Sequence, residues 1–439
     1  MKKIPLHWKI LGGMALGLLL GVIASQSALG VDLVKNWVKP FGTIFINLLK
    51  LIAIPLIIAS LIKGIADLQD ISKFSSLGIR TIVIYTMTTL IALSMGLAIV
   101  YAINPGKSIT EQTRNELVTD SNMGKADMRI ANAADQQNKS PLSFIVNMVP
   151  DNIFQAASGN RNMLQVIFFA IFFGISLLLI PEEKARPLMN FFDSLNDVVL
   201  KMVDLIMLYA PLGVMALMAA LVVETTNPDL FVALAKYAMA VVTGLFLMMG
   251  FYALVMWFYV GKSPVAFFKG IGPAQLIAFS TSSSAATLPV TMERVEEHLG
   301  VEKEVVSFVC PVGATINMDG TSLYQAIATV FICQAFNFTL TWGALLTILF
   351  TALLASIGTA AVPGAGVIML IIVLESVNFP SEFLALGIAM ILAVDRPLDM
   401  IRTTVNITGD ASVAMIVGKQ LGKLKNPNPK NWDDNKENF

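Results

Sequence analysis

Long apolar stretches constrain the fold of this chain more than any other feature of its sequence. They lie near residues 10–30, 41–62, 79–104, 162–181, 197–223 and 231–260. A helix needs roughly 20 apolar residues to cross the hydrocarbon core of a bilayer, so each stretch is near or above that length. Only 14% of the 439 residues are charged, against roughly 25% in an average soluble domain. The pattern predicts an all-α polytopic membrane protein.

Charge and composition exclude several classes of function. Thirty basic residues balance thirty acidic ones, so no net field would attract nucleic acid. Cys310 and Cys333 are too few for a disulfide framework, and His7 and His298 do not occur at the spacing of a zinc site. No nucleophile with a paired base stands out, so we do not expect an enzyme. We also expect no cofactor and, from the balanced charge, no nucleic-acid partner.

The distribution of Lys and Arg predicts the orientation of the chain in a cell (inner) membrane. Basic residues collect in the connections around Lys63 to Arg80, Lys184 to Arg186 and Lys262 to Lys269, as is typical of cytoplasmic loops. We therefore expect a multi-pass protein with both termini cytoplasmic and a polar extracellular loop near residues 105–140. The first apolar stretch follows Lys2 and Lys3 and could be a signal peptide, but its length favours a retained span.

The last 180 or so residues, roughly the length of a separate domain, interrupt their apolar stretches with polar and helix-breaking clusters. These clusters are Ser280-Thr-Ser-Ser-Ser284, Pro311 to Gly313, Asn317-Met-Asp-Gly320, Ser356-Ile-Gly-Thr359 with Pro363-Gly-Ala-Gly366, and Asn406-Ile-Thr-Gly-Asp410. Irregular backbone at membrane depth survives only where protein or a hydrated cavity covers it. We infer two re-entrant hairpins and two broken helices. A weak internal repeat, Thr-(Ile/Val)-Asn-(Met/Ile)-x-Gly, begins at Thr315 and again at Thr404.

A polar stripe marks the final apolar segment. Asp395, Asp399, Arg402, Asn406 and Asp410 fall within an arc of about 80° on a helix, at roughly 100° per residue. Arg402 can hold a substrate carboxylate through paired hydrogen bonds, and Asp399 can hold an ammonium group. Two alternatives stay open: a solvated helix end, or Asp399 and Arg402 simply neutralising each other. Arg396 is expected to point away from the stripe.

Carboxylates and amides near these breaks indicate a cation site. Asp319 and Asp410, with Asn317 and Asn406, offer the oxygen ligands that hard cations prefer. Buried aspartates are also compatible with proton transport, because burial favours the protonated form.

Four motifs follow one another in this region. They are Ser282-Ser-Ser284 leading to Thr287-Leu-Pro289, then Asn317-Met-Asp-Gly-Thr321, Thr359-Ala-Ala-Val-Pro363-Gly-Ala-Gly366, and Asp399-Met-Ile-Arg402-Thr403 with Asn406-Ile-Thr-Gly-Asp410. Together they resemble the glutamate and aspartate transporter homologues of the dicarboxylate/amino acid:cation symporter family, and the resemblance covers nearly the whole chain.

The resemblance implies eight transmembrane helices plus two re-entrant helical hairpins, inverted repeats, a homotrimer and an elevator-type transporter. It implies scaffold helices 1 and 2 over residues 1–78, transport-domain helix 3 over 79–104 and an extracellular loop over 105–143. Scaffold helices 4 and 5 would follow over 144–225. The transport domain, with helix 6, hairpin 1, helix 7, hairpin 2 and helix 8, would occupy 226–439.

The resemblance also implies roles for single residues. The expected substrate-binding residues are Arg402, Asp399, Thr321, Asn406, Thr403, Ser284 in the first hairpin, and the second hairpin's tip from Val362 to Gly366. The expected sodium sites are Gly313, Asn317, Asn406 and Asp410 for one; Thr315, Met318, Ser356, Ile357 and Thr359 for a second; and Tyr85, Thr88, Thr89, Asn317 and Asp319 for a third. The residues alone would make hydroxyls such as Tyr85, Thr88 and Thr89 helix-packing groups more readily than ion ligands.

These observations predict a symporter that takes up L-aspartate or L-glutamate with sodium as the coupling ion. A proton-coupled acidic amino acid symporter and a C4-dicarboxylate carrier remain as alternatives. A carrier of succinate or malate would keep Arg402 but find Asp399 an unfavourable neighbour.

Overall fold

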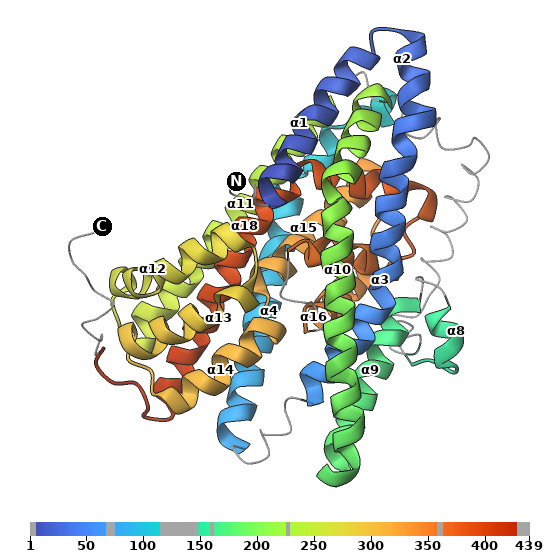
Figure 1. Ribbon diagram of the computed structural model, residues 1–439. Helices are drawn as coiled ribbons and strands as arrows, with labels where there is room; N and C mark the ends of the chain where they lie inside the picture. The colour runs from blue at the N-terminus through green and yellow to red at the C-terminus, as the bar shows by residue number, and fades with distance from the viewer. Residues whose placement is uncertain are drawn as a thin grey trace, which may run out of the picture.

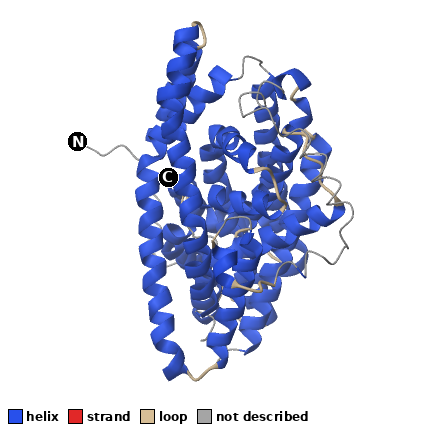
Figure 2. Cartoon of the chain, turned by 90° about the vertical axis from the view of Figure 1, so that its right-hand side faces the viewer, coloured by secondary structure: helices blue, strands red, loops and turns tan. Residues whose placement is uncertain are grey.

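The described part of the chain consists of helices and the turns that join them. The computed structural model describes residues 6–66, 75–114, 146, 149–158, 162–224, 229–357 and 363–427. Within these ranges no strand is drawn (Figure 2), and the β structure is limited to an isolated antiparallel bridge between Val301 and Leu424. The predicted all-α class is therefore confirmed for the described residues.

The helices divide into two sets along the chain. The first set is α1 (Leu6–Ala24), α2 (Ala28–Leu33), η1 (Val34–Val38), α3 (Lys39–Ala66), α4 (Ser75–Ile103), η3 (Pro105–Ser108), α8 (Ile153–Ala157), α9 (Met163–Leu179) and α10 (Glu182–Glu224). The second set is α11 (Asp229–Leu254), η5 (Val255–Val260), α12 (Pro264–Thr281), α13 (Ser284–Glu293), η6 (Arg294–His298), α14 (Lys303–Ile316), α15 (Asp319–Ala335), α16 (Trp342–Ile357), α17 (Ala365–Ser376) and α18 (Ser381–Gln420).

Each predicted apolar stretch is helical over most of its length. Four helical stretches are long and apolar enough to cross a membrane: 28–65, 76–108, 182–223 and 229–260. Two of the apolar stretches predicted from the sequence, 10–30 and 162–181, form shorter helices. The helix α1 ends at Ala24 and α9 ends at Leu179. Large apolar side chains also lie on the surface, including Leu208 at 67% and Phe246 at 68% exposure. Outward-facing apolar side chains on such helices are typical of a lipid-facing surface.

Small residues allow α1 to pack closely on α10, beside α3 (Figure 1). Gly13, Gly17 and Gly21 recur every fourth residue and therefore face the same side of α1. A Cβ atom at Gly13 or Gly17 would lie 2.3 Å from a backbone carbonyl oxygen of α10. Such small-residue spacing lets two membrane helices approach until their backbones touch.

The second set of helices surrounds α18, which packs against α11, α12, α14 and α15. Two helix pairs lie next to it. The helix α12 packs against α13 and α16 packs against α17, and α12, α13 and α17 also contact α18. The first pair turns at Ser282, whose φ of 53° is left-handed, and at Ser283, whose side chain caps α13 through the Ala286 amide. The pairs match the positions of the two predicted hairpins, while their re-entry into a membrane stays a prediction.

A predicted helix break is present between α14 and α15. Asn317 and Met318 leave helical geometry, with ψ angles of 88° and 59°, and both are buried. The residues of this break carry the polar groups from which the site described below is built.

The second predicted break, over Asn406 to Asp410, is wrong. The helix α18 runs without interruption from Ser381 to Gln420. Its hydroxyl side chains bond to carbonyl oxygens one turn earlier, as Thr408 does to Thr404 at 2.7 Å and Ser412 to Thr408 at 2.7 Å. Such back-bonding satisfies polar side chains inside a helix, so polar composition alone did not indicate a break.

The packing of α1 on α10 leads to a stability prediction. Gly17→Ala should lower the free energy of unfolding by about 1–3 kcal/mol, because the new methyl group overlaps the Met215 carbonyl oxygen. Thermal unfolding of the purified protein in detergent measures the change. Gly12→Ala is the matched control, since nothing lies within 4 Å of its Cβ position, and Ala is the better helix former. Equal effects of the two substitutions would contradict the packing account.

Candidate functional site

The Arg402 side chain is the largest that is fully buried among the described residues. Its Nη1 donates to Asp395 Oδ1 at 2.8 Å and its Nη2 to Asp399 Oδ1 at 2.7 Å. The guanidinium carbon lies 3.7 Å from the centroid of the Tyr324 ring, close enough for a cation–π contact. The α18 stripe therefore lies inside the protein, which rules out the alternative of a solvated helix end.

Asp399 lies between two guanidinium groups. One carboxylate oxygen accepts from Arg402 and the other from Arg396 Nη1 at 3.2 Å and from the Gly364 amide at 3.1 Å. The expectation that Arg396 points away from the stripe is wrong. Its side chain is long enough to reach along the surface of α18 to Asp399, one turn later. The mutual neutralisation of Asp399 and Arg402, kept open as an alternative, is present in this structure.

Asn406 ties α18 to the break before α15. Its Oδ1 accepts from the Gly320 amide at 2.8 Å, and its Nδ2 donates to Thr321 Oγ1 at 3.2 Å. The first turn of a helix has amides without partners in the helix, and here a neighbouring side chain supplies the acceptor. Thr321 and Arg402 both lie next to Gly366. A Cβ atom added at Gly366 would lie 3.4 Å from Thr321 Cγ2 and 3.3 Å from Arg402 Nη2.

Asp319 is buried at the start of α15 and joins three helices. Thr89 Oγ1 on α4 donates to its Oδ1 at 2.8 Å, and the Tyr252 hydroxyl on α11 donates to its Oδ2 at 2.6 Å. Both donors are buried themselves. Hydrogen bonds to a carboxylate stabilise its charged form against the cost of burial.

Asp410 places a second carboxylate, besides that of Asp319, at the same break. Its Oδ1 accepts from Asn317 Nδ2 at 3.0 Å, and Thr88 Oγ1 donates to Asn317 Oδ1 at 3.3 Å. A Cβ at Gly313 would lie 2.3 Å from the Tyr85 hydroxyl and 2.4 Å from Asp410 Oδ1. Only glycine leaves room for both groups. Gly313, Asn317 and Asp410, expected at one sodium site, therefore lie beside Tyr85, which was expected at another, and sodium binding by these residues stays a prediction.

The remaining predicted residues make hydrogen bonds only within their own helices or lie outside the described part of the chain. Thr315 is exposed and donates to the Val312 carbonyl, while Ser356 is buried and donates to Leu353. Met318 is buried at the break and Ser284 at the turn of the first hairpin, and Thr403 bonds to the Asp399 carbonyl at 2.9 Å. Thr359 and Val362 lie outside the described residues, as does the side chain of Ile357.

Several buried residues of this region were not among the predicted site residues: Asp395, Tyr252 and Tyr324, besides Arg396. Asp395 belongs to the stripe, but nothing in the sequence shows that it pairs with Arg402. A tyrosine within an apolar stretch, such as Tyr252 in α11, is a usable signal, because its buried hydroxyl requires a partner.

The site therefore combines an ion-pair network with an oxygen-rich break. The guanidinium of Arg402 can exchange an aspartate for a ligand carboxylate through the same hydrogen bonds. The carboxylate, amide and hydroxyl oxygens around Asp319 and Asp410 are ligands of the kind that hard cations bind.

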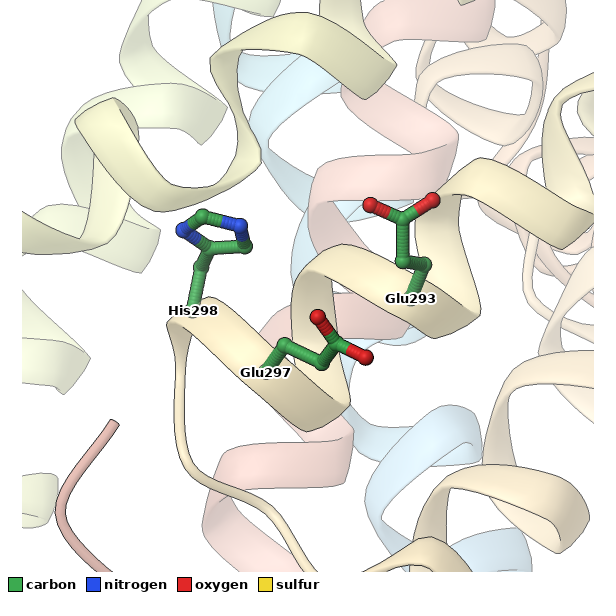
Figure 3. Close-up of side chains that lie close together, drawn as sticks. All are labelled: Glu293, Glu297 and His298. Atoms are coloured by element: carbon green, nitrogen blue, oxygen red, sulfur yellow. The ribbon is translucent and has the colours of Figure 1, made fainter. Parts of the chain in front are cut away.

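A separate cluster of ligand-type side chains lies where α13 runs into η6 (Figure 3). Donor atoms of Glu293, Glu297 and His298 lie within 4.8 Å of one another, because the π-helical turn widens the helix and places positions four and five apart on one side. Sodium prefers oxygen ligands over an imidazole nitrogen. This cluster is therefore not counted among the expected sodium sites.

Comparisons with known proteins agree with these features. The profile of the Sodium:dicarboxylate symporter family matches residues 6–420. The human "Excitatory amino acid transporter 3" is 36% identical, with 94% of this chain and 85% of the relative covered. The "Proton/sodium-glutamate symport protein" of Geobacillus stearothermophilus is 32% identical, with 98% of both chains covered.

The tight space at Gly313 gives a prediction for the site. Gly313→Ala should lower the free energy of unfolding by about 1–3 kcal/mol, because the methyl group displaces Asp410 or Tyr85 from its hydrogen bonds. Thermal unfolding in detergent measures the effect. Gly272→Ala on α12 is the control, with nothing within 4 Å of its Cβ position. A neutral Gly313→Ala variant would show that the site has more room than the structure indicates.

Proposed function

Because the chain belongs to the sodium:dicarboxylate symporter family, we propose that it is a secondary active symporter that takes up L-aspartate or L-glutamate with sodium ions. Its membership and its relatives' names indicate a membrane transporter of acidic amino acids rather than an enzyme. The observation that carries the proposal is the fully buried Arg402 beside a helix break rich in oxygen ligands.

Substrate binding follows from the ion pairs. A ligand carboxylate takes the Nη2 side of Arg402, near Thr321 and Gly366, and replaces the bond to Asp399. The carboxylate of Asp399 then accepts the ligand's ammonium group. Asn406 holds Thr321 against α18, and Thr403 and the first hairpin's Ser284 complete the proposed contacts, with Val362 and Gly366 at the second hairpin's tip.

Sodium binding follows from the oxygens at the break. One ion uses Asp410, Asn317, Asn406 and the Gly313 carbonyl, and another uses Asp319, Asn317, Tyr85, Thr88 and Thr89. A third uses Thr315, Met318, Ser356, Ile357 and Thr359. The contacts of Thr89 with Asp319 and of Asn317 with Asp410 support the first two assignments. Sodium and substrate should raise each other's affinity, since both order the same break.

Transport is proposed to proceed by an elevator movement in a homotrimer. Residues 79–104 and 226–439 form the moving transport domain, while residues 1–78 and 144–225 form the scaffold, with 105–143 outside the cell. Both termini lie in the cytoplasm. The close packing of α1 and α3 on α10 supports a scaffold of these helices, and the packing of α18 on α11, α12, α14 and α15 supports a separate moving unit.

Two further candidate functions rest on specific observations. The bacterial relative's name includes protons as well as sodium, and a proton could replace a cation on Asp319 or Asp410. The family's description names dicarboxylates, which would need Arg402 but no partner for an ammonium group.

Uptake into liposomes tests the proposal. Radiolabelled aspartate, glutamate, succinate and serine are offered under a sodium gradient and, separately, under a proton gradient. We expect concentrative uptake of aspartate or glutamate that requires sodium. Uptake driven by a proton gradient alone, or of succinate in place of the amino acids, would replace the proposal with one of the two alternatives.

Replacing the buried guanidinium should strongly weaken substrate binding. Arg402→Ala is expected to weaken aspartate binding by roughly 30-fold or more, equivalent to about 2 kcal/mol at least, the usual range for truncating one partner of a buried charge pair. Isothermal titration in sodium buffer measures the affinity. Stabilisation by sodium in thermal unfolding serves as the control for folding, and retained aspartate affinity would remove the role of Arg402.

Neutralising Asp410 should reduce the affinity for sodium. Asp410→Asn keeps the shape of the side chain but removes the charge that would face the cation, so the apparent sodium affinity should fall roughly tenfold, or about 1.4 kcal/mol. Sodium titration of aspartate binding measures it. Asp204→Asn, on the exposed surface of α10, is the control, and an unchanged sodium affinity in Asp410→Asn would count against the site.

A further inference from the structure

Arg396 is a buried charge to which the proposed binding mode assigns no task. Its side chain is 8% exposed, and its Nη1 donates to Asp399 Oδ2 at 3.2 Å. Asp399 is the carboxylate proposed to accept the ligand's ammonium group. One oxygen of this carboxylate is therefore already engaged by a cation on its own helix.

The charges of this network sum to zero without a ligand. Asp395 and Asp399 balance Arg396 and Arg402, and all four residues are more than nine-tenths buried. When a ligand carboxylate takes the Nη2 of Arg402, Asp399 loses that partner. A buried carboxylate left without a cation is strongly unfavourable, and Arg396 is the remaining cation within reach.

The two ligand classes place different demands on that pair. An acidic amino acid brings an ammonium group, which must compete with Arg396 for Asp399. A C4-dicarboxylate brings no ammonium, so it needs Arg396 to stay on Asp399. We propose that Arg396 is a specificity-determining residue, which weakens the preference for acidic amino acids and permits dicarboxylates to bind. This inference rests on the proposed function of the same site.

The surroundings of Arg396 allow its head group to move. Together with Asp395, it lines a cavity of about 30 Å³, and the other lining residues are Gly364 and apolar side chains from α1, α3, α10, α17 and α18. Within the described part of the chain, the Nε of Arg396 has no hydrogen-bond partner. A guanidinium with an open donor beside a cavity can withdraw from Asp399 when an ammonium group arrives.

The experiment measures aspartate binding by isothermal titration in sodium buffer and succinate binding by competition against aspartate. Arg396→Gln should raise the affinity for aspartate relative to succinate at least tenfold. The ammonium group of aspartate then no longer competes with Arg396 for Asp399, whereas bound succinate leaves Asp399 without a cation. Arg396→Lys should restore part of the wild-type ratio. Arg80→Gln, an exposed arginine of α4, is the matched control.

A cycle with Asp399→Asn separates pairing from a general change in charge. Succinate is titrated directly in this cycle, because Asp399→Asn removes the group proposed to bind the ammonium of the competing aspartate. If Arg396 acts through Asp399, Arg396→Gln lowers succinate affinity in the wild-type background and has little effect in the Asp399→Asn background. An equal loss in both backgrounds would overturn the inference. So would an Arg396→Gln variant that binds aspartate and succinate more weakly by the same factor, which is the result of a purely structural role.

Two outcomes separate this inference from the function on which it rests. If the wild-type protein shows no sodium-dependent aspartate binding, the proposed function fails. If the wild type binds aspartate but succinate does not compete, the aspartate measurement decides: a higher affinity in Arg396→Gln supports the role of Arg396, and a lower or unchanged affinity overturns it.

Discussion

A guanidinium without access to water is the constraint on which the rest of this structure depends. An isolated buried charge is far too costly to keep, so Arg402 requires partners, and α18 supplies Asp395 and Asp399 at 2.8 and 2.7 Å. The Tyr324 ring from α15 covers the group at 3.7 Å. These contacts fix the packing of α15 on α18, and they leave a cation whose partners a ligand can exchange.

The break between α14 and α15 is the second feature on which the site depends. Breaking a helix frees backbone groups that need partners, and Asn406 of α18 accepts the amide of Gly320. The break also turns the side chains of Asn317 and Asp319 toward α4 and α18, where Thr88, Thr89 and Asp410 meet them. A buried guanidinium and a group of side-chain oxygens therefore lie side by side on one helix pair, which is the arrangement that the proposed coupling of an acidic solute to a cation requires.

Much of this arrangement follows from local patterns in the sequence. Helical periodicity placed Asp395, Asp399 and Arg402 on one face, and the residues at Asn317 and Met318 predicted the break. The same reasoning failed at Asn406 to Asp410, because polar residues do not break a helix when they bond to the previous turn or to a neighbouring helix. It failed again at Arg396, since a long side chain is not confined to the direction of its Cα–Cβ bond.

The sequence by itself determined the apolar helices, the common face of the polar residues of α18 and the family of the chain, because period, length and motif are local properties of the residues. Only the tertiary structure decided which charges meet. Tyr252 of α11 reaches Asp319 of α15, and Asp399 is shared between Arg396 and Arg402. Such partnerships depend on how separate helices pack and on which rotamer each side chain adopts, and neither is encoded in the spacing of residues along one helix.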